Sequence, residues 1–173
     1  MYQGWSPEMI SPVSGNTLIV GRALIEIEPF AVPADFDPGE KIDTDAWADA
    51  AKSAGMTYGV LTAKHVGGFC LWDSKHTTYD VMHPDCPYQQ DLVAQFIQSF
   101  KSRGLKAGLY YCWRHPGFGD PNKHKVLPPE CDPATHTLQE QITFQKKQIA
   151  ELAERYPESP WCRKARFAAG VAL

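Results

Sequence analysis

The densest group of side chains that could act on a ligand lies in residues 62–74, which read TAKHVGGFCLWDS. Lys64 and His65 follow an apolar run where a strand is expected to end, so both should face the space above a sheet edge. The Gly-Gly pair allows a sharp turn or a close approach to a ligand. Phe69 and Trp72 carry flat apolar rings that suit the C–H faces of a sugar. The alternative is structural, with both rings packed beneath the loop and His65 a hydrogen-bonded scaffold residue, and from this segment alone we favour it.

Cysteine and histidine side chains suggest a second kind of site, a zinc centre. Five candidate ligands fall within one segment: Cys112, His115, His124, Cys131 and His136. Structural zinc sites use two close ligand pairs separated by a spacer, and here only Cys112 and His115 have such a spacing. We therefore predict no metal and no cofactor. The five cysteines of the chain lie far apart without a C-x-x-C pair, so we expect free, mostly buried thiols.

Three aspartates are candidates for catalytic carboxylates: Asp85, Asp91 and Asp132. Asp91 precedes an apolar helical pattern and is better explained as a helix N-cap. Asp85 and Asp132 stand beside prolines, which is typical of turns. We therefore identify no catalytic residue in this chain.

Helical and strand patterns alternate along the chain from residue 42 onward, and glycine is expected at the helix ends because it tolerates a left-handed backbone. The expected elements are strands at Thr17–Val20 and Ala23–Ile27, a connection over Pro33–Gly39, a helix from residue 43 to Gly55, a strand at Thr57–Ala63, a helix from Asp91 to Gly104, a strand at Leu105–Trp113 and a helix at Thr137–Arg155. The last helix carries its apolar side chains on one broad face, formed by Leu138, Ile142, Ile149 and Leu152.

This alternation is the signature of βα units around a parallel sheet. The sequence has no G-x-G-x-x-G after a strand, which argues against a doubly wound dinucleotide-binding sheet. The two strand-to-helix loops are long and carry His, Trp, Asp and Tyr, as the C-terminal face of a barrel does. Because a complete barrel takes about 250 residues, we predict an α/β fold that is a partial (β/α)8 TIM barrel of roughly three to four units. We expect one incomplete domain, with an irregular, β-containing segment over 1–40, βα units over 41–156 and a divergent tail over 157–173.

Composition excludes several classes of protein. Hydrophobic residues make up 43% of the chain and charged residues 21%, so it is not mostly disordered. Lys and Arg number 17 against 20 Asp and Glu, and a net charge of -3 gives no reason to bind nucleic acid or anionic lipid. No apolar run nears the roughly 18 residues of a membrane span, and residues 1–12 carry no secretory signal. We expect a soluble globular chain whose location, otherwise unknown, is cytoplasmic by default.

Three blocks of the sequence together resemble one known family. They read FDPGEKIDTDAWADAAKSAGM, TYGVLTAKHVGGFCLWDSKHTTYDV and DLVAQFIQSFKSRGLKAGLYYCW. They occur in the order of the matching blocks in glycoside hydrolase family 29, the α-L-fucosidases, whose middle block is roughly L-T-x-K-H-H-D-G-F-x-L-W-x-S. The resemblance covers residues 36–113 closely and continues loosely to Tyr156. Several blocks in the correct order make chance similarity a poor explanation.

The resemblance implies a βα barrel that hydrolyses terminal α-L-fucosyl links of a fucosylated glycan or fucoside with retention of configuration. Retention needs two carboxyl groups about 5 Å apart, a nucleophile and an acid/base. In the family the nucleophile is an aspartate in a Trp-containing strand after the helix that here ends near Tyr156, whereas this chain has Trp161 and no aspartate after it. We therefore expect an enzyme by family whose hydrolysis is impaired in this chain. A degenerate, non-catalytic sugar-binding or interaction module is the alternative.

The resemblance also implies which residues bind the sugar: His65, Trp72, Tyr111 and Trp113. Of the family's histidine pair only His65 is present, because Val66 and Gly67 stand where the family has histidine and aspartate. Each lost polar contact in a desolvated pocket typically costs about 1–3 kcal/mol. Tyr110 and Tyr111 cannot both point into the pocket because strand side chains alternate. We favour Tyr111, which is nearer the functional edge.

The end of the chain and its open edges lead to two more expectations. Half a barrel leaves sheet edges and an apolar inner face uncovered, so we expect self-association through those edges. A truncated or specialised chain and a change of coding frame after about Tyr156 are alternative explanations of the ending. The nucleotide sequence beyond that point distinguishes them.

Overall fold

The computed structural model describes residues 17–18, 33–38, 42–65, 67–113 and 129–157 of the chain. Its elements are β1 (Thr17–Leu18), η2 (Pro33–Asp35), α1 (Thr44–Ser53), β2 (Tyr58–Lys64), α2 (Leu92–Ser102), β3 (Lys106–Tyr111), η3 (Pro129–Cys131) and α3 (Leu138–Arg155). The three α-helices and the two longer strands begin and end within two residues of the predicted bounds. The predicted strand at Ala23–Ile27 lies outside the described residues.

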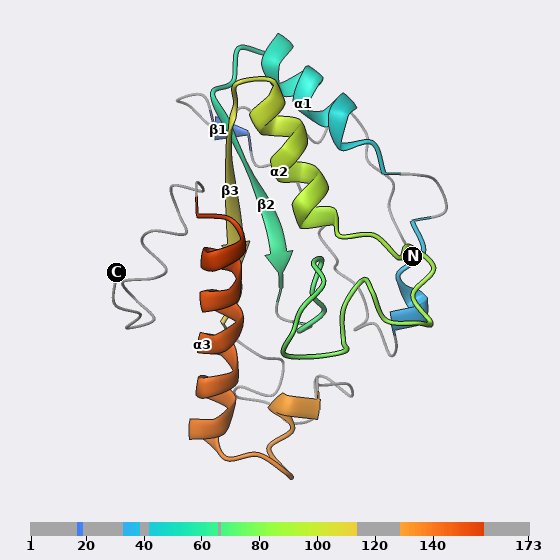
Figure 1. The fold of residues 1–173 in the computed structure, drawn as a ribbon, viewed down its shortest axis with the longest axis vertical. Helices are drawn as coiled ribbons and strands as arrows, with labels where there is room; N and C mark the ends of the chain where they lie inside the picture. The colour runs from blue at the N-terminus through green and yellow to red at the C-terminus, as the bar shows by residue number, and fades with distance from the viewer. Residues whose placement is uncertain (1–16, 19–32, 39–41, 66, 114–128, 158–173) are drawn as a thin grey trace.

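The three strands form one parallel sheet in the order β1-β2-β3. Tyr58 pairs with Lys106 and Leu61 pairs with Leu109, so β2 and β3 run side by side in the same direction (Figure 1). α2 packs on both of these strands, and α1 packs against α2. The predicted α/β arrangement of strand, helix and parallel strand is therefore confirmed for the described part of the chain.

The first two α-helices begin and end at the residues that the sequence singled out. Asp43 accepts a hydrogen bond from the Ala46 amide at 2.9 Å, and Asp91 accepts one from the Ala94 amide at 2.8 Å. Both carboxylates satisfy backbone donors that the first helical turn leaves unpaired. Gly55 and Gly104 follow the two helices with φ angles of 74° and 72°, a left-handed backbone that residues with a Cβ adopt at a cost. These caps explain why the helices stop where they do.

The core between the sheet and α2 depends on a close approach of backbone to aromatic ring. Phe96 and Phe100 are completely buried, and their ring centroids are 4.2 Å apart. A Cβ placed on Gly59 of β2 would lie 2.5 Å from Cε1 of Phe100. The absence of a side chain at Gly59 therefore lets α2 settle onto the sheet.

Polar side chains join α1 to α2 at the outer surface of this core. The Arg103 guanidinium pairs with Asp49 and, at 2.8 Å, with Asp45. The Ser99 hydroxyl donates to Asp45 at 2.6 Å and also lies 2.8 Å from the Thr44 hydroxyl. The Ser99 hydrogen bond and then Arg103 lower the pKa of the Asp45 carboxyl below its ordinary value. These contacts fix the rotation of one helix against the other.

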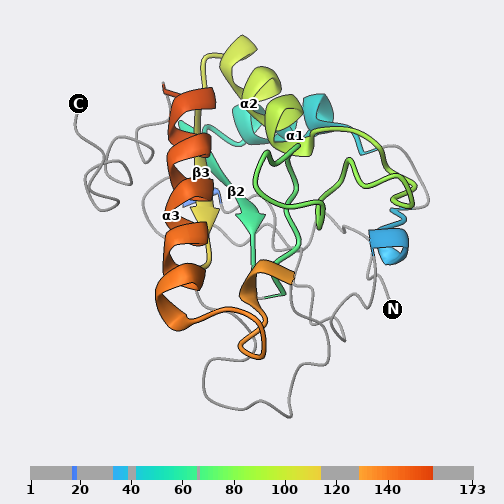
Figure 2. The same ribbon diagram turned by 60° about the horizontal axis from the view of Figure 1, so that its bottom comes forward.

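α3 runs alongside β3, apart from the α1–α2 pair (Figure 2). Its predicted apolar face is only partly correct, because Leu152 is buried but Leu138 is 55% exposed. The helix instead buries a largely polar stripe: Gln141, Phe144, Gln145, Gln148, Glu151, Leu152 and Ala153. Although α3 has 18 residues, neither it nor any other described helix is apolar enough to cross a membrane.

Replacing Gly59 by alanine should destabilise the fold. The new methyl group would overlap the buried Phe100 ring, and overpacking of this kind typically costs about 1–3 kcal/mol. Urea unfolding followed by circular dichroism measures the change in free energy. Gly67→Ala is the matched control, because a Cβ there meets nothing within 4 Å. Equal unfolding midpoints for the two variants would contradict the close approach of β2 and α2.

Candidate functional site

The carboxyl ends of β2 and β3 meet at one edge of the sheet. β2 ends at Lys64, which pairs with Tyr111 at the end of β3, and the Cys112 amide donates to the Lys64 carbonyl at 2.9 Å. His65 directly follows Lys64, and Trp113 lies two residues beyond Tyr111, so both come just after the carboxyl ends of the paired strands. Parallel pairing thus brings together two segments that are almost fifty positions apart in the sequence, as was predicted.

An irregularity at the end of β2 turns Lys64 into the protein interior. Thr62 pairs with Tyr110 but Lys64 pairs with Tyr111, so Ala63 is an extra residue in the strand. Such bulges re-aim side chains next to functional sites. Lys64 is 1% exposed, its Nζ donates to the Cys112 carbonyl at 2.7 Å, and the same atom lies 4.5 Å from the centre of the Tyr111 ring. Burial lowers the pKa of this amine.

The two adjacent tyrosines of β3 have different surroundings. The Tyr111 hydroxyl donates to Oε1 of Gln148 on α3 at 2.7 Å, and its ring centre lies 6.4 Å from that of Trp72. Tyr110 is 47% exposed, and its ring centre lies 6.1 Å from that of His65. Sequence reasoning favoured Tyr111 as the residue of the pair that faces the pocket, and this stays a prediction. In the structure the ring of Tyr110 is the one that lies beside His65.

The aromatic residues of the loop after β2 are enclosed. Trp72 is completely buried, its Nε1 donates to Glu151 on α3 at 3.2 Å, and Phe69 is also buried. Both rings therefore pack beneath the loop, which is the structural alternative stated for this segment. Trp113 at the end of β3 is 60% exposed. In this arrangement Trp113, and not Trp72, presents an aromatic face at the surface of the site.

His65 has the environment of a hydrogen-bonding residue rather than of a permanent cation. Partial burial lowers its pKa below the ordinary value of 6.5, and the neighbouring Lys64 amine lowers it further. A neutral imidazole carries one donor and one acceptor nitrogen. Both nitrogens match what a sugar hydroxyl offers. Sugar binding by His65, Trp72, Tyr111 and Trp113 nevertheless stays a prediction.

The candidate zinc ligands do not converge among the described residues. In that part of the chain no three His, Cys, Asp or Glu side chains are close enough to hold a metal ion, while His115 and His124 lie outside it. The four described cysteines are buried thiols outside any disulfide, as expected: Cys70, Cys86, Cys112 and Cys131. Burial raises the pKa of Cys131 to about 12, so this thiol does not ionise near neutral pH.

The three aspartates considered as catalytic carboxylates have the structural roles that were predicted. Asp91 caps α2. Asp132 accepts a hydrogen bond from the Ala134 amide at 2.8 Å within its own turn. Asp85 is exposed and lies in a turn beside His83.

Sequence reasoning missed the polar residues of α3 that hold the site. Glu151 is 5% exposed and Gln148 is completely buried, and both bind residues of β3 or of the loop after β2. The signal was present as glutamines at positions 141, 145 and 148, which share one helix face. Because a stripe of glutamines is usually solvated, the pattern indicated that this face of α3 is exposed, whereas it is buried.

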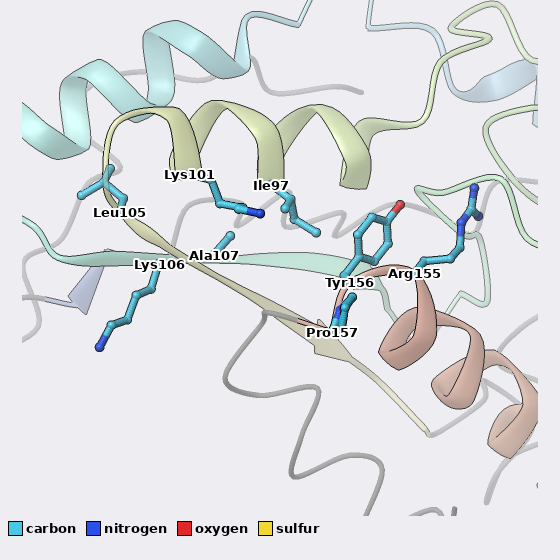
Figure 3. A pocket seen from close by; sticks show the side chains of 8 residues that line it. All are labelled: Ile97, Lys101, Leu105, Lys106, Ala107, Arg155, Tyr156 and Pro157. Carbon is cyan, nitrogen blue, oxygen red and sulfur yellow. The ribbon is translucent and has the colours of Figure 1, made fainter. Parts of the chain in front are cut away.

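A separate groove lies at the other end of β3. It has a volume of about 230 Å³, and it lies between α2, the start of β3 and the end of α3 (Figure 3). Its lining includes Ile97, Ala107 and Tyr156, with Lys101 and Arg155 at the sides. Because β3 begins at this end, the groove is distinct from the edge that carries His65.

A parallel sheet flanked by helices, with polar and aromatic residues at the carboxyl ends of its strands, defines the βα class of catalytic domains. A bacterial fucosidase with an iminocyclitol inhibitor superposes with a TM-score of 0.57 at 29% identity, covering 73% of this chain and 27% of that protein. An α-L-fucosidase of family GH29 from Bacteroides thetaiotaomicron, trapped as a covalent intermediate, superposes with a TM-score of 0.53 at 28% identity, over 78% of this chain and 28% of its own. These fucosidases are TIM-barrel catalytic domains.

Sequence comparison agrees with the structural likeness. The family model described as Alpha-L-fucosidase matches residues 30–162. Alpha-L-fucosidase 1 of Arabidopsis thaliana is 37% identical over 81 residues, covering 46% of this chain, and a putative alpha-L-fucosidase of Caenorhabditis elegans is 28% identical over 141 residues, covering 78%. The chain belongs to the α-L-fucosidases, glycoside hydrolase family 29. It spans 16% of the length of the Arabidopsis relative and 27% of that of the C. elegans relative.

His65 should titrate with a midpoint below pH 6.5, because both partial burial and Lys64 disfavour its charged form. The unfolded chain then binds more protons than the folded chain between the two midpoints, so protonation of His65 opposes folding as the pH falls through this window. NMR titration of the ring Cε1–H resonance, assigned with His65→Gln, measures the midpoint. A midpoint at or above 6.5 would contradict the described environment.

Proposed function

We propose that this chain forms the fucose-binding part of an α-L-fucosidase-like (β/α)8 barrel, roughly its first three to four βα units. The fucosyl group of a glycan or fucoside is its ligand. The observation that carries the proposal is that His65 and Tyr110 lie side by side at the carboxyl ends of paired parallel strands, with Trp113 two residues beyond β3, inside the region that matches the family. Barrel enzymes bind their substrates at this face.

The proposed roles follow from exposure. His65 hydrogen-bonds a sugar hydroxyl through its neutral ring, and Trp113 supplies an apolar surface for the C–H face of the sugar. Trp72 and Tyr111 belong to the same site through the residues that they support, since Trp72 lies below the loop and Tyr111 is bonded to α3. Tyr110 adds a phenol beside His65.

Hydrolysis is a separate matter from binding. Retaining catalysis needs two carboxyl groups about 5 Å apart, and Asp85, Asp91 and Asp132 are committed to turns or to a helix cap. We propose that the 173-residue polypeptide by itself binds the sugar without cleaving it efficiently. Val66 and Gly67, which replace polar residues of the family pattern, favour weak binding and make a non-catalytic sugar-binding module the second candidate.

Calorimetric titration with L-fucose tests the binding function. We expect His65→Ala to weaken binding about tenfold, because a desolvated hydrogen bond to the sugar is lost. His83→Ala is the matched control, since its ring accepts a hydrogen bond from the Asp85 amide in its own turn. D-galactose, which has a comparable hydroxyl pattern in the opposite configuration, is the control ligand. Failure of the wild-type chain to bind fucose in preference to D-galactose would overturn the proposal.

Hydrolysis of an aryl α-L-fucoside tests the second part of the proposal. We expect the purified 173-residue polypeptide to release no aryl alcohol above the rate without protein, since neither carboxylate of the double displacement is identified. The sensitive control is a catalytically active fucosidase assayed in the same buffer. Turnover that persists through purification and disappears in His65→Ala would show that catalytic carboxylates are present after all.

A further inference from the structure

We propose that Glu151 and Gln148 on α3 are positioning residues for the sugar-binding edge. They act from behind it, through the loop after β2 and through the end of β3, without contacting the ligand. This inference rests on the proposed function, because the edge that they hold is the one assigned to fucose.

The buried carboxylate of Glu151 accepts several hydrogen bonds from the loop after β2. Its Oε2 accepts hydrogen bonds from Nε1 of Trp72 and from the Ser74 hydroxyl, each at 3.2 Å. Its Oε1 accepts one from the Lys75 amide at 2.9 Å and lies 3.7 Å from the Arg155 guanidinium. Three residues of one short segment therefore depend on a single side chain of α3.

Gln148 makes the corresponding contacts one helical turn earlier. Its Oε1 accepts the Tyr111 hydroxyl at 2.7 Å, and its Nε2 donates to Sγ of Cys70 at 3.2 Å. Residues three apart lie on the same side of a helix. The two side chains thus form one polar face that reaches both the end of β3 and the loop after β2.

Backbone pairing carries this hold to His65. Cys70 forms a bridge with Lys64, and the Leu71 amide donates to the Ala63 carbonyl at 2.9 Å. The loop that Glu151 holds is therefore paired through its backbone with the last residues of β2, which directly precede His65. On the other strand Gln148 holds Tyr111, which directly follows Tyr110. Tyr110 is thus one residue away from Tyr111, which Gln148 holds, and His65 is one residue away from Lys64, which pairs with Cys70 of the loop that α3 holds.

A buried carboxylate suits positioning better than it suits stability. Burial of a charge is costly unless it is fully hydrogen-bonded, and an apolar side chain in its place often stabilises a protein as well or better. The carboxylate instead fixes the orientation of the groups around it, because its hydrogen-bond donors must lie at defined angles. Arg155 pairs with Glu151 and also with Asp91 at the start of α2, so it links the Glu151 carboxylate to α2. The polar face of α3 thus selects one geometry of the loop.

Glu151→Gln tests the proposal, because it keeps the size of the side chain and removes its charge. We expect the affinity for L-fucose to fall about tenfold, and Glu154→Gln, an exposed position on the same helix, to leave it unchanged. Urea unfolding of both variants measures stability in parallel. A stability loss in Glu151→Gln with unchanged fucose affinity would overturn the positioning role.

A milder variant keeps the test decisive if Glu151→Gln folds poorly. Ser74→Ala removes one donor to Glu151 and should by itself weaken fucose binding, by less than the tenfold expected of Glu151→Gln. The indole N–H resonance of Trp72, assigned with Trp72→Phe, should also move in Glu151→Gln. An unmoved indole resonance overturns the contact itself. A wild-type chain that binds no fucose overturns the proposed function, and with it the role of Glu151 in affinity, whatever the indole shows.

Discussion

The parallel pairing of β2 with β3 is the constraint on which the rest of the described structure depends. The helix between these strands, α2, packs on them where Gly59 of β2 has no side chain, so that Phe100 can lie against the strand. Once the strands are in this register, their carboxyl ends coincide, and the residues that follow them share one edge of the sheet. The position of the candidate site is thus set first by the strand register, and only then by contacts among the residues of the site.

The same edge is built in two layers of different character. The exposed layer contains His65, Tyr110 and Trp113, which can meet a ligand. The buried layer contains Trp72 and Tyr111, which bond to α3. A resemblance to a family motif marks residues of both layers alike, because position in a motif does not record depth in the protein. Exposure separates the two groups, and the proposed roles follow it: ligand contact for the first group and orientation for the second.

Much of the fold could be predicted from local chemistry. Asp43 and Asp91 indicate where helices begin, and Gly55 and Gly104 indicate where they end. Short runs of β-branched or aromatic residues indicate the strands. The inward direction of Lys64 and the buried face of α3 could not be predicted in the same way. The first depends on the extra residue at Ala63, which a two-residue period does not contain. The second depends on partners for Gln148 and Glu151 that are more than thirty positions away.

Two buried ionisable groups flank the loop after β2, and each is compensated by its own neighbours. Lys64 has the Cys112 carbonyl and the Tyr111 ring, while Glu151 has Trp72, Ser74 and Arg155. Because the acid is matched by Arg155 on its own helix, its charge is locally balanced, whereas the amine acts on the residue that follows it. Partial burial lowers the pKa of His65, and the neighbouring Lys64 lowers it further, so both favour the neutral form of the ring. The sequence Lys-His at the end of a buried strand thus places an inward-facing amine next to an outward-facing histidine, where it adds to the effect of burial on the histidine.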